Sequence, residues 1–213
     1  DGSSSITVLN HEHPLRTLPF KLRFRFYDPL IRLKRKHIQT AYFTIYNISV
    51  KKDISLCDFS YVRSYLKEKQ ISVQEKTIII GTNPVLFNSY NDYYLFLAET
   101  IKKYVKDESE NVWYCPHRTE APSQEIDILL NRYGITRHIS RYCVEVDLLL
   151  NNCYPNCVIG FGSTALSSLK IIYPNADVLC VKFPNSVLLT LKSEGYDGIY
   201  EYLKKQGVNI LSL

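Results

Sequence analysis

The sequence predicts an α/β fold built on a doubly wound parallel sheet between residues 75 and 213. Short apolar runs rich in β-branched residues recur along this part of the chain, and each is followed by apolar residues at helical spacing. The connections between these segments are short. Repeated strand–helix units of this kind form a parallel sheet whose two faces are both covered by helices.

The first strand–helix unit shows the pattern. Residues 76–80 form an apolar run that ends at Gly81, as expected for a buried parallel strand. A helix follows over residues 92–105, because its apolar residues recur every three or four positions. Asn91 or Asp92 is the expected N-cap of this helix.

The later units repeat the same order. A helix over residues 124–133 is expected to end at Gly134, because glycine readily adopts the left-handed conformation that closes helices. Further strands are expected at residues 112–115, 135–139, 157–160, 177–183 and 208–211. The remaining helices are expected over residues 144–150, 163–172 and 196–206.

Residues 1–74 lack this regularity and are predicted to be the tail of another domain with a connector. Three elements are expected in them, a basic helix over 19–37, a strand over 41–47 and a helix over 59–69. The boundary is expected near residues 70–75, which divides the chain into domains 1–74 and 75–213. The sequence contains no methionine, so residue 1 is not expected to be a natural start, and a preceding segment is expected.

Composition and charge narrow the class of protein. Hydrophobic residues make up 46% and charged residues 22% of the chain, which is typical of a soluble globular protein. The net charge of +5 includes a basic run at residues 32–37, which either attracts anionic lipid headgroups or is a solvated helix face. Without aromatic motifs of the RNA-binding type, we do not expect nucleic acid as a partner.

The cysteines favour a reduced compartment. Cys153 and Cys157 are the close pair among the six, and no second pair or nearby histidine completes a zinc set. We therefore expect free thiols, a cytoplasmic location and no metal.

The first candidate motif directly follows the predicted strand 112–115 and comprises residues 116–120. In an open parallel sheet, ligands bind beyond the carboxyl ends of the strands. His117 and Arg118 can present two hydrogen-bond donors to a phosphate there, and a histidine can also act as a general acid near neutral pH. The alternative is a polar loop whose side chains are only solvated.

The second candidate motif is the glycine turn at residues 160–164. Gly162 lets the backbone approach a ligand closely, and Ser163 and Thr164 open the next helix, where unpaired N–H groups favour anions. The alternative for one hydroxyl is ordinary helix capping. Glu145 lies between the two motifs, either as a partner for ribose hydroxyls or as a surface residue.

Together these motifs resemble bacterial sialyltransferases of the two-lobed GT-B fold, especially the lipooligosaccharide sialyltransferase and polysialyltransferase families. Those enzymes carry a His-Pro motif and, some forty residues later, a Ser-Ser/Thr motif. Here His117 and Ser163 are 46 positions apart (163 − 117). In this chain, Arg118 stands where those families have proline.

The resemblance implies CMP-sialic acid as donor and a surface glycan, such as capsule or lipooligosaccharide, as acceptor. It implies that His117, with Arg118, binds the phosphate and assists the departure of CMP. It assigns the ribose to Glu145 and the phosphate also to Gly162, Ser163 and Thr164. The residues from 75 to the end would then be a Rossmann-like domain that binds the CMP-sugar, and residues 1–74 part of the acceptor-side lobe.

The start of the chain adds one element to the resemblance. The families carry an acidic pair followed by glycine, whose carboxylate is the general base, and Asp1-Gly2 matches the end of that motif. The resemblance thus implies inverting, metal-independent transfer with no cofactor, by a bacterial protein at the inner face of the membrane, contacted through residues 32–37. A homodimer is a further expectation. Another nucleotide sugar, or a non-catalytic nucleotide- or phosphate-binding module, is the alternative.

Overall fold

The computed structural model describes residues 42–44, 54–56, 58–105, 111–184, 186–188 and 195–213. The chain divides into two compact units, Asp1–Asp58 and Phe59–Leu213. Three predictions lie outside the described residues, namely the role of Asp1, the helix over 19–37 and the membrane contact of the basic run 32–37.

Two short strands are described in the first unit. β1 (Tyr42–Thr44) pairs in parallel with β2 (Ile54–Leu56). β1 lies inside the strand that the sequence predicts over residues 41–47.

Helix α3 (Ser60–Glu68) belongs to the second unit. Its Leu66 is buried, and the guanidinium of Arg63 donates a hydrogen bond of 3.3 Å to the carbonyl of Ile171. The division of the chain after Asp58 therefore differs from the predicted boundary near residues 70–75, because α3 packs onto the sheet domain.

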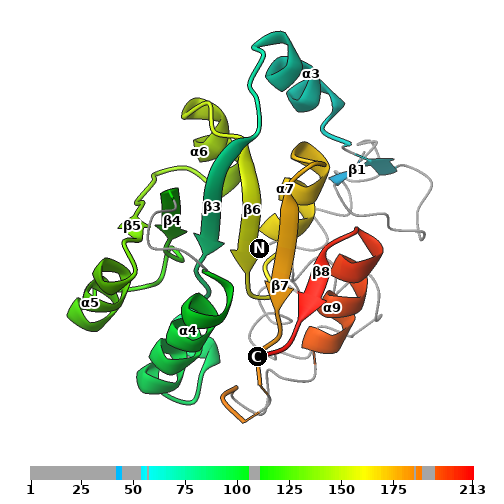
Figure 1. Ribbon diagram of the computed structural model, residues 1–213. Helices are drawn as coiled ribbons and strands as arrows, with labels where there is room; N and C mark the ends of the chain where they lie inside the picture. The colour runs from blue at the N-terminus through cyan, green and yellow to red at the C-terminus, as the bar shows by residue number, and fades with distance from the viewer. Residues whose placement is uncertain (1–41, 45–53, 57, 106–110, 185, 189–194) are drawn as a thin grey trace, which may run out of the picture. The chain divides into compact units, whose positions relative to one another are not determined.

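Six parallel strands form the sheet of the second unit, in the order β5-β4-β3-β6-β7-β8 (Figure 1). The strands are β3 (Gln74–Ile80), β4 (Asn111–Cys115), β5 (Thr136–Arg137), β6 (Pro155–Gly160), β7 (Asp177–Val181) and β8 (Asn209–Leu211). The helices between them are α4 (Tyr90–Tyr104), α5 (Gln124–Arg132), α6 (Val144–Leu150), α7 (Ala165–Ile172) and α9 (Tyr196–Lys205), with a 3₁₀ turn at Pro84–Leu86. The predicted α/β class and its parallel sheet are confirmed.

The strand order is that of a Rossmann-like sheet. Counted from the first strand of the unit, it reads 3-2-1-4-5-6, the doubly wound order. The chain runs outward from β3 to β5, then returns to place β6 on the other side of β3. This reversal opens a crevice beyond the carboxyl ends of β3 and β6, which is where such sheets bind ligands.

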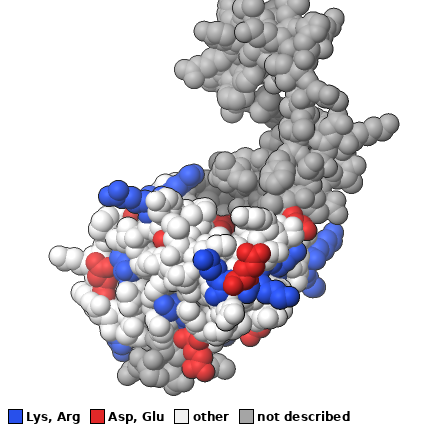
Figure 2. Space-filling view, turned by 90° about the horizontal axis from the view of Figure 1, so that it is seen from above, with Lys and Arg blue, Asp and Glu red and all other residues white. Residues whose placement is uncertain are grey.

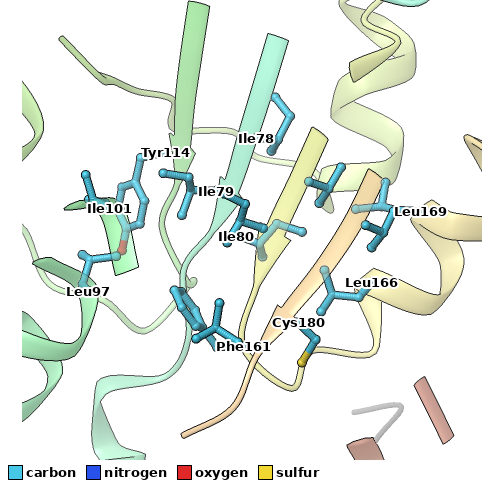
Figure 3. Close-up of a cluster of buried hydrophobic side chains, with 14 of the residues drawn as sticks. Ile78, Ile79, Ile80, Leu97, Ile101, Tyr114, Phe161, Leu166, Leu169 and Cys180 are labelled. Atoms are coloured by element: carbon cyan, nitrogen blue, oxygen red, sulfur yellow. The ribbon is translucent and has the colours of Figure 1, made fainter. Parts of the chain in front are cut away.

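The core lies on both faces of this sheet. Helix α4 contacts α5, and α6 contacts α7. This agrees with the right-handed crossover rule, which places the first pair on one face of the sheet and the second pair on the other. The isoleucines of β3 are buried on both faces, as the apolar run predicts. Figure 3 shows Leu97 and Ile101 of α4 beside Tyr114, and Leu166 of α7 beside Cys180.

The sequence predicts the C-terminal end of α5 and the N-cap of α4. Gly134 closes α5 with φ of 64°, as predicted. The N-cap of α4 is Ser89, and neither Asn91 nor Asp92 has that role. Ser89 Oγ accepts from the backbone N–H of Asp92 at 3.1 Å and donates to its carboxylate at 2.9 Å. Asp92 thus takes the third helical position of a reciprocal cap, and the helix begins earlier than predicted.

Within the described residues, no helix is both long and apolar enough to cross a bilayer.

Candidate functional site

A cavity of about 430 Å³ opens at the carboxyl ends of the central strands. Its lining residues come from the segments that directly follow four strands. They are Ile80 and Gly81 at the end of β3, Cys115, Pro116, His117 and Arg118 at the end of β4, His138, Ser140, Arg141, Tyr142, Cys143, Val144 and Asp147 after β5, and Ser163 after β6. The cavity therefore lies at the point where the strand order reverses.

His117 is oriented by the residues of its own turn. Its Nδ1 lies 2.8 Å from Thr119 Oγ1 and 3.2 Å from the backbone nitrogen of Thr119. Thr119 Oγ1 in turn donates to Asn83 Oδ1 at 3.0 Å. These contacts occupy Nδ1 and leave Nε2 to a ligand. Because the single hydroxyl hydrogen of Thr119 goes to Asn83, the contact with Oγ1 takes its hydrogen from Nδ1. Nε2 then carries the lone pair of the neutral ring, and it donates to a phosphate once the ring is protonated.

The charge state of His117 follows from its surroundings. Burial lowers its pKa from the usual 6.5, and the adjacent Arg118 lowers the pKa further, while Glu120 opposes both. The lowered pKa favours the neutral imidazole at pH 7. A bound phosphate would favour the charged form, because an anion close to the ring stabilises imidazolium.

The buried carboxylate of Glu120 anchors the turn that carries His117. Glu120, whose side chain is fully buried, accepts a hydrogen bond of 2.6 Å from Tyr93 and a second from Tyr114. Arg137 donates a third, of 3.2 Å, to the other oxygen. The backbone N–H of Glu120 also donates to the carbonyl of His117 at 2.8 Å. The turn is thus tied to α4, β4 and β5 at once.

Gly81 lets the His117 turn lie against the end of β3. A Cβ placed on Gly81 would lie 2.9 Å from the backbone nitrogen of His117 and 2.8 Å from the hydroxyl of Tyr114. Both distances are shorter than atomic contact allows. The glycine that the sequence places at the end of this strand is therefore required by packing against the candidate site.

The glycine turn after β6 contributes one of its three predicted residues to the cavity. Ser163 lines the cavity, and its Oγ accepts from the backbone N–H of Ala165 at 3.3 Å. Thr164 and Gly162 do not line it. Gly162 has φ of 59°, its N–H donates to Cys180 Sγ at 3.2 Å, and a Cβ there would lie 2.8 Å from the Tyr196 ring. Its role in the turn is conformational.

The structure places Glu145 away from the cavity. Its carboxylate accepts a hydrogen bond from Ser168 Oγ, which joins α6 to α7. The residues that α6 contributes to the cavity are Val144 and Asp147. Two positions along a helix correspond to a rotation of about 200°, so the two carboxylates point in different directions.

Residues after β5 also line the cavity, and none of them was predicted from the sequence to belong to the site. Nε2 of His138 lies 2.5 Å from one oxygen of Asp147, and Ser140 Oγ donates to the other at 2.5 Å. The His138 ring stacks on Trp113, with centroids 4.2 Å apart and planes 6° apart. The signal was present, because His138 lies within the strand that the sequence predicts over 135–139 and Ser140 directly follows it.

The cavity is basic. His117, Arg118, His138 and Arg141 line it, while Asp147 is the single carboxylate among the lining residues. Burial raises the pKa of the lining thiol of Cys115 to about 12, so it stays protonated. Figure 2 views the molecule from the top of Figure 1, the side on which these strands begin, and shows positive and negative side chains interspersed. The cavity lies at the other end, and with Arg118 and Arg141 against a single carboxylate it suits an anion.

No group of three or more histidine, cysteine or acidic side chains that could hold a metal ion is found in the described part of the chain.

No protein-family model and no curated protein matches this chain.

Proposed function

We propose that the Phe59–Leu213 unit binds a nucleotide-activated sugar, with the phosphate at His117, Arg118 and Ser163. The observation that carries this proposal is that these three residues, from two separate sequence motifs, line one basic cavity at the reversal point of a doubly wound sheet. Sheets of this order bind phosphorylated ligands at this position, and His–Arg pairs supply matched donors.

The reaction is inferred from the resemblance of the two motifs to those of bacterial GT-B sialyltransferases. We propose that the protein transfers sialic acid from CMP-sialic acid to a sugar hydroxyl. The acceptor oxygen forms a bond to the anomeric carbon while the bond from that carbon to the phosphate oxygen breaks. The acceptor proton goes to the general base, a carboxylate of the acidic pair whose end Asp1 matches in the resemblance. The electron pair of the broken bond leaves with CMP.

The leaving phosphate explains the need for His117. The phosphate gains negative charge as the bond breaks, and donors already aimed at that charge lower the barrier. Nε2 of His117 is the nitrogen that the Thr119 contacts leave available. Burial, and after it the adjacent Arg118, which also lines the cavity, lower the pKa of the imidazole, and a bound anion acts in the opposite direction.

Binding of CMP to the full chain tests the site. Isothermal titration calorimetry should show that CMP binds more tightly than UMP or GMP. The affinity for CMP should fall in each of three variants, His117→Ala, Arg118→Ala and Ser163→Ala. The expected loss is roughly fivefold to a hundredfold, the value of a charge-assisted hydrogen bond. Arg132→Ala, which removes an exposed arginine at the end of α5, serves as the matched control and should leave the affinity unchanged.

Transfer by the full-length protein tests the chemistry. With CMP-sialic acid and an acceptor glycan, His117→Ala should lower kcat by about a hundredfold or more, as expected for loss of a general acid. Full activity in that variant would overturn the role of His117. Tighter binding of UMP or GMP would instead favour another nucleotide sugar, and CMP binding without any transfer would favour a non-catalytic nucleotide-binding module.

A further inference from the structure

The His138–Asp147 pair offers the cavity an acceptor of hydrogen bonds. A carboxylate accepts, so the short contact between Asp147 and Nε2 of His138 places a hydrogen on that nitrogen. In the neutral ring Nδ1 then carries the lone pair. Stacking on Trp113 fixes the plane of the ring. His138 lines the cavity, with its side chain 22% exposed.

Four other polar side chains of the cavity, Arg118, Ser140, Arg141 and Asp147, are cationic or already have hydrogen-bond partners. Arg118 and Arg141 only donate. Asp147 is buried, and both of its oxygens already have partners in His138 and Ser140. Ser140 donates to Asp147 and accepts from the backbone N–H of Tyr142 at 3.0 Å.

A nucleotide brings hydroxyls that need an acceptor. In doubly wound folds, an acidic side chain commonly accepts from the ribose hydroxyls. Glu145, to which the resemblance assigns this role, is engaged with Ser168 and does not line the cavity. Asp147 lines the cavity, but its two oxygens are engaged by His138 and Ser140.

We propose that Nδ1 of His138 accepts a hydrogen bond from a ribose hydroxyl of the bound nucleotide, with Asp147 as the residue that positions the ring. The inference rests on the proposed function in taking a nucleotide as ligand. It makes His138 the residue by which the site distinguishes a ribonucleotide from the analogue that lacks this hydroxyl.

Calorimetry with CMP, 2′-deoxy-CMP and 3′-deoxy-CMP on the full chain tests this assignment. The wild-type chain should bind CMP roughly three- to tenfold more tightly than one of the two analogues, the value of a single hydrogen bond. His138→Phe keeps a ring to stack on Trp113 but has no Nδ1. This variant should bind CMP as weakly as the wild-type chain binds that analogue. Its affinity for the analogue should equal that of the wild-type chain.

The unchanged affinity for the analogue shows that the variant is folded and still holds the phosphate. His138→Asn gives a second variant, which is polar but too short to join Asp147 to a ligand, and it should behave in the same way. Glu145→Gln is the matched control and should keep the wild-type preference for CMP.

The outcomes separate the two proposals. Equal binding of all three nucleotides by the wild-type chain, or an undiminished preference in His138→Phe, would overturn the role of His138 and leave nucleotide binding standing. An equal loss of affinity for CMP and both analogues in His138→Phe would also overturn it, since that result indicates a structural role. Absence of any nucleotide binding would overturn the proposed function itself.

Discussion

The phenol of Tyr93 donates a hydrogen bond of 2.6 Å to the buried carboxylate of Glu120, which links helix α4 to the turn that carries His117. Burial and the adjacent carboxylate raise the pKa of Tyr93, so the phenol keeps its proton and remains a donor. Tyr114 and Arg137 donate to the same carboxylate. Glu120 therefore joins three elements beneath the candidate site.

Glu120→Gln should destabilise the fold by about 2–4 kcal/mol, because it removes charge-assisted hydrogen bonds from buried partners. Urea unfolding followed by circular dichroism measures the change. Asp127→Asn is the matched control. The carboxylate of Asp127 is half exposed and lies 3.0 Å from Nε of Arg137 as an ion pair without hydrogen-bond alignment, so its loss should cost about 1 kcal/mol or less. Equal effects of the two substitutions would contradict the role given to Glu120.

His117 should make ligand binding depend on pH. In the empty cavity burial and Arg118 hold its pKa below 6.5, whereas a bound phosphate raises the pKa. The complex therefore binds more protons than the free protein, and affinity should rise as pH falls from about 8 towards about 6. A CMP ester is the suitable ligand, because its phosphodiester keeps one charge across this range. Calorimetry in buffers of different ionisation enthalpy measures the proton uptake.

The same titration with His117→Gln provides the control. The glutamine has no proton to gain, so the pH dependence should disappear. A pH dependence equal to that of the wild-type chain would assign the proton uptake to another group.

Gly81→Ala should disturb both stability and the site. The new Cβ would press on the backbone of His117 and the hydroxyl of Tyr114, at a cost of about 1–3 kcal/mol for overpacking. CMP affinity should fall as well, because the His117 turn must move. Gly198→Ala is the matched control. It lies within α9 with no atom within 4 Å of its Cβ position, so the fold should gain up to about 1 kcal/mol. Thermal unfolding and calorimetry compare the two.

Much of the local structure could be predicted because it depends on local patterns. The apolar run of β3 and the glycine at the end of α5 are visible without any knowledge of the fold. The cap of α4 was missed by a few residues, since Ser89 and Asp92 are both good capping residues and only the backbone conformation distinguishes their positions.

The candidate site was predictable in part for the same reason. His117 and Ser163 each directly follow a predicted strand, and the parallel sheet puts the ends of such strands at one edge. The pairing of β3 with β6 could not be predicted in this way. Their residues lie about eighty positions apart in the chain, and no periodicity specifies which strands pair.

By itself, the sequence determined the alternation of strands and helices, the parallel sheet and the strand ends that bear His117, Arg118 and Ser163. Only the tertiary structure decided that Asp147, and not Glu145, reaches the cavity. Both carboxylates lie on α6, and a separation of two residues turns them to different sides of the helix. The packing of α6 against the sheet and α7 then determines which side meets His138 and which meets Ser168.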